Sequence, residues 1–210
     1  MAAFDLQEQE QIDELKAWWS KWGRLVSGCL IAVVVGYLGR HAWQAYQNNQ
    51  GNSAAEAYAA VEAGVEAKDP AKVRAAAEKM RTDNANAALT PRAMLVAAKT
   101  AFEAGDLDNA RKSLEWVVAN AKEDALIDTA NLRLAAVLLD QKQFDAALKA
   151  VQGAKVASFA ALFADMRGDV LSIKGDIAGA KAAYQEALVK LDAKAPVRKL
   201  VETKLNALGA

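Results

Sequence analysis

The sequence is poor in the residue types from which most active sites are built. Its 210 residues include one cysteine, Cys29, and one histidine, His41. A disulfide framework, a metal site or a histidine-based triad needs more thiol and imidazole groups than these two residues supply. Phosphate-binding loops of the Walker or Rossmann type are also absent from the sequence. We therefore expect a protein that is not an enzyme and that needs no cofactor and no metal.

The chain also lacks an excess of either charge. It carries 26 Lys and Arg against 26 Asp and Glu, so its formal net charge is zero. A nucleic-acid-binding domain normally presents a basic field, and a disordered tail often shows a block of like charges. Neither pattern is present, and we expect no nucleic-acid partner.

Prolines are few, and strand-like alternation over six residues is absent. All three prolines, Pro70, Pro91 and Pro196, stand where helical patterns begin, a position that tolerates proline. The sequence therefore predicts an all-α protein. The expected helices after the first 50 residues cover 54–67, 70–81, 91–104, 107–120, 125–141, 144–153, 158–173, 177–191 and 196–208.

One long apolar stretch is present, from Leu25 to Gly39, and it contains no charge. Tryptophans stand on both sides of it, and the 22 residues from Trp22 to Trp43 make about 33 Å of helix, enough to cross a bilayer. A cleaved signal peptide is the competing interpretation, but the acidic head and the absence of an A-x-A site after the apolar run disfavour it. We expect a transmembrane helix over 23–43.

The basic residues near the span predict its orientation. Lys16, Lys21 and Arg24 precede the span, whereas only Arg40 follows it closely. The positive-inside rule then puts a short segment, 1–22, in the cytoplasm and the large domain across the membrane. The opposite orientation, with a cytoplasmic domain, would follow if this bias misleads.

A polar run, 44–53, follows the span and precedes the large domain. It is rich in Asn and Gln and contains Gly51, so we expect a hinge or short loop, with Ser53 as the N-cap of a helix beginning near Ala54.

Inside the span, three small residues recur every four positions: Gly28, Ala32 and Gly36. This spacing puts them on one helix face, where a second transmembrane helix could approach closely. The alternative is that the small residues have no partner, because such residues are common in any transmembrane helix.

Three segments of the large domain, 101–110, 138–147 and 171–180, share one pattern. Each has an apolar helix end, a tight turn, an apolar residue and then an alanine, at Ala110, Ala147 and Ala180. The alanines are 37 and 33 residues apart, which is the period of a tetratricopeptide array of paired antiparallel helices. The resemblance to that repeat family covers about 91–190, with Lys142 replacing the usual turn glycine.

Tetratricopeptide arrays bind peptides on the concave face lined by the first helix of each pair. Apolar residues would form its floor, with basic residues at one end and acidic ones at the other. Some of the apolar residues could instead pack between helices, since repeats must bury a continuous apolar face. The inward positions predicted by this register are Arg92, Leu95, Lys99, Phe102, Leu132, Ala136, Leu139, Asp165 and Asp169.

The last predicted helix, 196–208, is amphipathic, with Val197, Leu200, Val201, Leu205 and Leu208 on one stripe. A terminal repeat must close the solenoid, so we expect a capping helix. A partner-binding tail is the alternative.

The head of the chain reads FDLQEQEQIDELKAWW from Phe4 to Trp19 and is followed by Trp22-Gly23. With the single span and the repeat domain, it resembles the YfgM-like family of bacterial inner-membrane proteins, ancillary subunits of the Sec translocon. The resemblance implies that 54–210 is a periplasmic domain with a C-terminal capping helix. It also implies two partners, the Sec translocon subunits and a membrane-anchored periplasmic chaperone.

Two functions are compatible with these features. In the first, the domain receives exported unfolded chains near the Sec channel and couples them to chaperones. In the second, it is a structural scaffold for envelope assembly or cell division, with no role in export.

Overall fold

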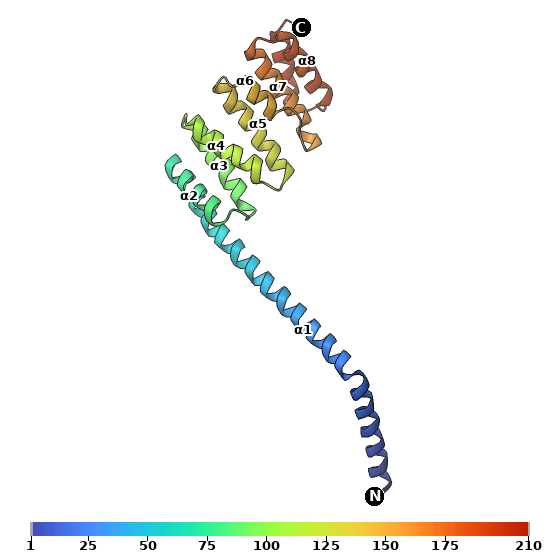
Figure 1. Ribbon diagram of the computed structural model, residues 1–210. Helices are drawn as coiled ribbons and strands as arrows, with labels where there is room; N and C mark the ends of the chain where they lie inside the picture. The colour runs from blue at the N-terminus through green and yellow to red at the C-terminus, as the bar shows by residue number, and fades with distance from the viewer. Residues whose placement is uncertain (1, 210) are drawn as a thin grey trace. The chain divides into compact units, whose positions relative to one another are not determined.

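The computed structural model describes the backbone of residues 2–209 and the side chains of 11–44 and 51–209, and the described part contains helices and no strand. The all-α prediction is confirmed. The chain divides into two compact units, 1–51 and 52–210. The helices, shown in Figure 1, are α1 (Ala2–Glu66), α2 (Pro70–Asp83), α3 (Leu89–Glu103), α4 (Leu107–Asn120), α5 (Asp124–Asp140), α6 (Phe144–Ala150), the short 3-10 helix η1 (Ala157–Phe159), α7 (Ala160–Lys174), α8 (Ile177–Lys190) and α9 (Arg198–Ala207).

The first unit is one helix with its apolar side chains turned outward. The segment Gln11–Gln44 is long and apolar enough to cross a membrane, and among residues 11–44 only Gly23 is buried. Apart from Val26, the valine and leucine side chains from Leu25 to Leu38 are more than half exposed. A helix that is apolar on every side suits a lipid environment.

The helix does not end where the sequence predicted a hinge. α1 passes through 44–53 without a break, so the predicted loop and the helix start at Ser53 are wrong. The polar run contains no proline, and a single helical glycine such as Gly51 costs only about 1 kcal/mol relative to alanine. The boundary between the two compact units, after Gly51, still falls inside this run.

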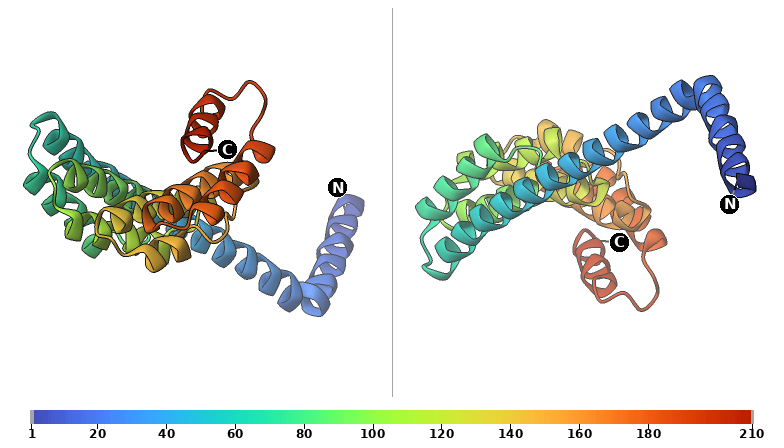
Figure 2. Two further views of the ribbon diagram at one scale, coloured as in Figure 1. Left: turned by 90° about the horizontal axis from the view of Figure 1, so that it is seen from above. Right: turned by 90° about the horizontal axis from the view of Figure 1, so that it is seen from below.

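In the second unit, consecutive helices pack side by side in pairs: α3 with α4, α5 with α6, and α7 with α8 (Figures 1 and 2). Each pair turns at a residue with left-handed backbone, Gly105 (φ 77°), Lys142 (φ 58°) and Gly175 (φ 92°). After each of them, the next backbone N–H donates to a carbonyl five residues earlier, as in the Schellman motif. The three elbows therefore have one geometry, as the repeat pattern predicted.

The small residues of the repeat pattern lie where the paired helices touch. Ala110, Ala147 and Ala180 are fully buried. Gly168 has the closest neighbour, because a Cβ added there would lie 2.4 Å from Cε1 of Tyr184. Small side chains at these positions allow the close helix approach that the sequence predicted.

The extra residues of the 37-residue repeat form a loop after α6, and a buried aspartate holds it. Asp128 of α5 is fully buried, and its carboxylate accepts hydrogen bonds from the backbone N–H groups of Lys155 (3.0 Å) and Val156 (2.8 Å). This contact fixes the approach to α7. Nothing in the local sequence distinguishes Asp128, since its partners lie 27 and 28 residues further along the chain.

The helix starts differ slightly from the predicted ones. Pro70 is at the first helical position, with Asp69 as the N-cap. α3 begins at Leu89, two residues before the predicted start, and the buried Thr90 hydroxyl donates to the Asn84 carbonyl at 2.6 Å. Pro196 precedes α9 by two residues.

Candidate functional site

An apolar groove lies between α3, α4 and α5. Its volume is about 250 Å³, and three of its lining residues, Lys99, Phe102 and Ala136, are predicted inward positions. Phe102 is 40% exposed although it is aromatic. The groove is lined by Ala98, Lys99, Phe102, Leu114, Arg133, Ala136 and Val137.

Two basic side chains border this groove. Lys99 lies one helical turn before Glu103, and the closest distance between their charged atoms is 3.7 Å, with both side chains well exposed. Arg133 donates from Nη1 to the Leu95 carbonyl at 3.4 Å. An exposed pair of this kind contributes little to stability, so Lys99 is free to exchange Glu103 for another carboxylate. The site thus combines an apolar floor with a cationic rim.

The predicted apolar floor is smaller than the sequence suggested. Leu95 is only 8% exposed and belongs to the core, so its assignment to the binding surface is wrong. Leu132 and Leu139 are half-buried and pack against the same core. The alternative, that some of these residues pack between helices, therefore holds for Leu95 and in part for two others. Phe102 is the exposed apolar residue of the set.

Arg92 lies away from the groove and is already bound. Its Nη2 donates to both carboxylate oxygens of Glu123, at 3.0 and 2.8 Å, and its Nη1 donates to the Ala88 carbonyl at 2.6 Å. This forked contact joins the start of α3 to the residue before α5. Arg92 therefore has a structural role in this conformation.

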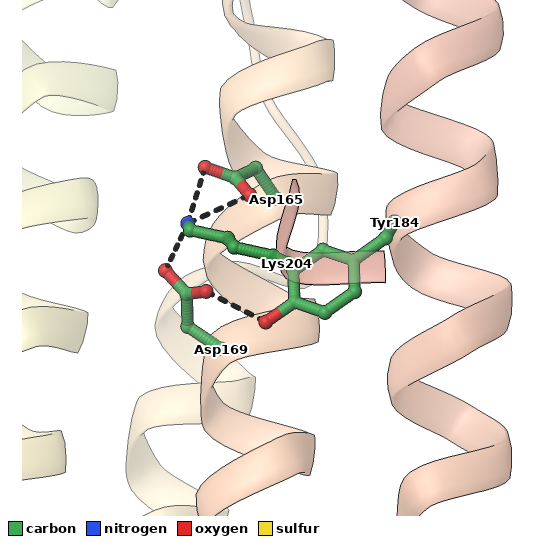
Figure 3. Close-up of polar contacts among 4 residues, drawn as sticks. All are labelled: Asp165, Asp169, Tyr184 and Lys204. Atoms are coloured by element: carbon green, nitrogen blue, oxygen red, sulfur yellow. Dashed lines mark hydrogen bonds and ion pairs between the residues drawn. The ribbon is translucent and has the colours of Figure 1, made fainter. Parts of the chain in front are cut away.

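The predicted acidic residues of α7 are also occupied, and by the chain's own last helix. Figure 3 shows the Lys204 ammonium of α9 between the two carboxylates. Its Nζ donates to both oxygens of Asp165, at 2.9 and 3.0 Å, and to Asp169 at 2.8 Å. The Tyr184 hydroxyl of α8 donates to the other Asp169 oxygen at 2.8 Å. We call these four residues the α7–α9 cluster.

The α7–α9 cluster is half-buried, and this shifts the pKa values of three of its groups. The side chains of Asp165 and Asp169 are 14% and 25% exposed. Burial raises the pKa of Asp165, against the opposing hydrogen bond from Lys204. Burial alone would lower the pKa of Lys204, but its hydrogen bonds and ion pairs with Asp169 and Asp165 outweigh this and raise it. Burial, and then the bond to Asp169, raise the pKa of Tyr184.

α9 closes the end of the domain with part of its predicted stripe. Val201 is fully buried, and Val197, Leu205 and Leu208 pack partly against the apolar cluster of α7 and α8. Leu200 is 54% exposed, so it does not belong to the packed stripe. Lys204, which sequence analysis did not select, completes the contact. Its partners stand 39 and 35 residues earlier, a separation that no local pattern reveals.

In the span, the predicted packing face is open. Gly28, Ala32 and Gly36 are exposed, and a Cβ added at either glycine would meet nothing within 4 Å. Among the described residues, no group of three His, Cys, Asp or Glu side chains is placed to hold a metal ion. The described residues of the span and of the helical domain therefore offer surfaces for binding.

Comparisons with known proteins agree with these features. Residues 16–210 match a family described as a tetratricopeptide repeat-like domain. The chain is 32% identical to an "Ancillary SecYEG translocon subunit" of Neisseria gonorrhoeae, over 98% of this chain and 99% of the relative. Proteins of the same name from Escherichia coli (32%, 96% of each chain) and Haemophilus influenzae (31%, 88% of this chain and 90% of the relative) are also similar. No solved structure matches the chain.

Proposed function

The chain belongs to the family of ancillary SecYEG translocon subunits with a tetratricopeptide repeat-like domain, and from this we propose that it binds beside the Sec channel and receives chains that cross it. Three features support the proposal: one apolar span, an open face of small residues on that span, and an apolar groove in the helical domain. Each would serve one step, namely anchoring, channel contact and binding of the exported chain.

The span would fix the protein in the inner membrane with its N-terminus in the cytoplasm. The excess of basic residues before the span supports this orientation, which puts 52–210 in the periplasm. The face of Gly28, Ala32 and Gly36 would then pack against a helix of the channel, because small side chains let two backbones approach closely in lipid.

The groove is the observation that carries the binding step. Phe102 is exposed above an apolar floor, and Lys99 and Arg133 stand beside it. A groove of about 250 Å³ suits one large apolar side chain, and the rim favours a carboxylate close to it. Exported unfolded chains would supply such segments, and a membrane-anchored periplasmic chaperone would accept these chains next.

The closed end at α7 favours a second candidate function. With Asp165 and Asp169 bound by Lys204, the inner surface available for binding is shorter than the repeat register suggested. A short surface with one aromatic contact also suits a single fixed partner. The protein would then be a scaffold for envelope assembly or cell division.

Site-specific photocrosslinking in living cells tests the proposal. A photoreactive residue would replace Phe102 or Lys99 in the groove, with Lys112 as the control, because it is exposed on α4 and does not line the groove. Adducts with several exported chains and with a chaperone, from the groove positions alone, are expected. One constant adduct with a division or cell-wall protein would establish the scaffold instead.

The same experiment in the span tests the channel contact. Gly28 and Gly36 would be compared with Leu30 and Val34, which lie about half a turn away on the same helix. Adducts with a channel subunit from the glycine positions only are expected. A reporter fused after Ala210 checks the orientation, and activity only in the cytoplasm would contradict it.

A further inference from the structure

An exposed apolar stripe precedes the span. Ile12, Leu15, Trp18, Trp19 and Trp22 follow one another at intervals of three or four residues, or are adjacent. At about 100° per residue they cover an arc of about 120° on the helix. The remaining arc holds Asp13, Glu14, Lys16, Ala17, Ser20 and Lys21, and Gln11, the first residue of the segment, is the one polar residue within the apolar arc. The described residues 11–22 thus form an amphipathic helix, which we call the N-terminal stripe helix.

No part of the described protein covers this stripe. The five apolar side chains are between 45% and 65% exposed. The two adjacent indoles of Trp18 and Trp19 lie 6.2 Å apart, measured between ring centroids. Three neighbouring tryptophans in water would form an apolar patch of a kind that normally marks a membrane or protein contact.

The stripe continues directly into the membrane span. Its last residue, Trp22, is two positions before Arg24, and the uncharged run begins at Leu25. Whatever surrounds Leu25 must therefore lie within about one helical turn of Trp22. This continuity favours lipid as the partner of the stripe, since indole rings are most stable at the boundary between headgroups and acyl chains.

Gly23 joins the stripe helix to the span. The Trp19 indole lies against this glycine, where an added Cβ would be 3.1 Å from the indole Nε1. Within the first unit, α1 also bends in its dark-blue N-terminal part (Figure 2). A helix that bends near the start of the span does not continue along the membrane normal, so the residues before it can lie closer to the membrane plane.

The charges of residues 11–22 would not attract this helix to an anionic membrane surface. Asp13 and Glu14 balance Lys16 and Lys21, and Lys16 pairs with Asp13 at 3.2 Å. A helix attracted by anionic lipid would carry an excess of basic residues. Here the apolar area of the stripe must provide the binding free energy.

We propose that the N-terminal stripe helix, residues 11–22, lies in the headgroup layer as an interfacial helix, with Ile12, Leu15 and the three tryptophans turned toward the acyl chains. Lys21, Glu14 and Asp13 then face water. The surface binds lipid whether or not the chain joins a channel. Its effect is to fix the rotation and the depth of the span at this end, in addition to the anchoring that the span itself provides.

Spin labelling of the full chain in vesicles tests this placement. In a Cys29→Ala background, a nitroxide would be attached after Leu15→Cys on the stripe or, as the matched control, after Ala17→Cys on the polar face. The protein would be reconstituted in vesicles of phosphatidylethanolamine and phosphatidylglycerol. The Leu15 label is expected about 5–10 Å below the phosphates, accessible to oxygen and shielded from an aqueous nickel relaxant, and the Ala17 label is expected in water.

Two outcomes would overturn the proposal. Equal exposure of both labels to the aqueous relaxant would mean that the helix extends into water. Shielding of the Leu15 label from oxygen as well as from nickel would mean that protein covers the stripe, as in a contact between two copies.

A second pair of variants separates stripe binding from charge. Ile12→Glu should move the Leu15 label into water, whereas Ala17→Glu should leave it in lipid. Neutral phosphatidylcholine vesicles and high salt should leave the label where it is. Movement of the Leu15 label into water in either condition would contradict the proposal that burial of apolar side chains binds this helix to the membrane.

Discussion

The inner faces of α3 and α7 stand at equivalent positions in the repeat but have different neighbours. On α3, Phe102 and Lys99 border an open groove. On α7, Asp165 and Asp169 are bound by Lys204 of the closing helix. The next element along the chain therefore decides whether an inward position of the repeat register is available to a partner.

The largest expected effect contrasts two apolar residues of α3. Leu95→Ala should lower the free energy of unfolding by about 2–5 kcal/mol, because it opens a cavity in the core. Phe102→Ala should change stability by less than about 1 kcal/mol but remove the groove adducts. Urea unfolding of the detergent-solubilised chain and photocrosslinking from Lys99 measure the two effects. The prediction is contradicted if Leu95→Ala removes the groove adducts and leaves the free energy of unfolding unchanged.

At the closed end, Gly168→Ala should lower the free energy of unfolding by about 2–3 kcal/mol. The new methyl group would displace the Tyr184 ring and break its bond to Asp169. Gly153→Ala is the matched control, because nothing lies within 4 Å of a Cβ at that position. Equal thermal midpoints for the two variants would show that α7 and α8 can move apart at no cost.

Opening the closed end without disturbing its packing requires removal of one charge. Lys204→Met keeps the length of the side chain but leaves Asp165 and Asp169 without their cation, at a cost of about 2 kcal/mol. Amide exchange in α9 should accelerate. Lys199→Met, on an exposed part of the same helix, should have no such effect. Unchanged exchange in α9 would mean that the apolar contacts alone hold it.

A smaller effect is expected from alkaline pH. The pKa values of Lys204 and Tyr184 are raised in the fold, so both groups hold their protons more tightly there than in the unfolded chain. Their stabilisation is complete below the ordinary pKa values, near 10, and is lost as the pH rises through the raised values. Urea midpoints should fall above about pH 10.

The Lys204→Met variant is the control for this pH effect, and it should show a weaker fall. Asp165 acts with the same sign, but at acid pH. Because burial raises the pKa of its carboxyl group, its contribution to stability decreases as the pH rises from its ordinary value near 4.

The sequence was sufficient to predict the helices α2 to α9 and the elbows between paired helices, because these depend on local patterns. Gly105 and Gly175 end helices, and the alanines five residues beyond each turn residue lie at helix contacts. Lys142 adopts the same left-handed backbone although it is not a glycine. The repeat pattern around it therefore predicted this turn better than the residue type at position 142.

The site was predicted less completely, because exposure depends on partners distant in the chain. Leu95 and Phe102 have the same register, but only the packing of the neighbouring helices buries the first. The bonds of Lys204 and Asp128 cross 27 to 39 residues. The continuity of α1 was missed for a different reason: Asn, Gln and Ser favour loops only weakly, and no proline enforces one.

The core of the domain consists of two apolar clusters that meet at α7. Phe163 and Val170 belong to the cluster that extends back to the C-terminal part of α1, whereas Ala164 belongs to the one shared with α8 and α9. If α8 and α9 separated from the rest of the domain, Phe163 would keep its neighbours in the larger cluster. We therefore expect the C-terminal end of the chain to unfold in a separate early step, while the groove at Phe102 stays folded. A protease acting on this partly unfolded form would cleave α8 and α9 and leave the preceding helices intact.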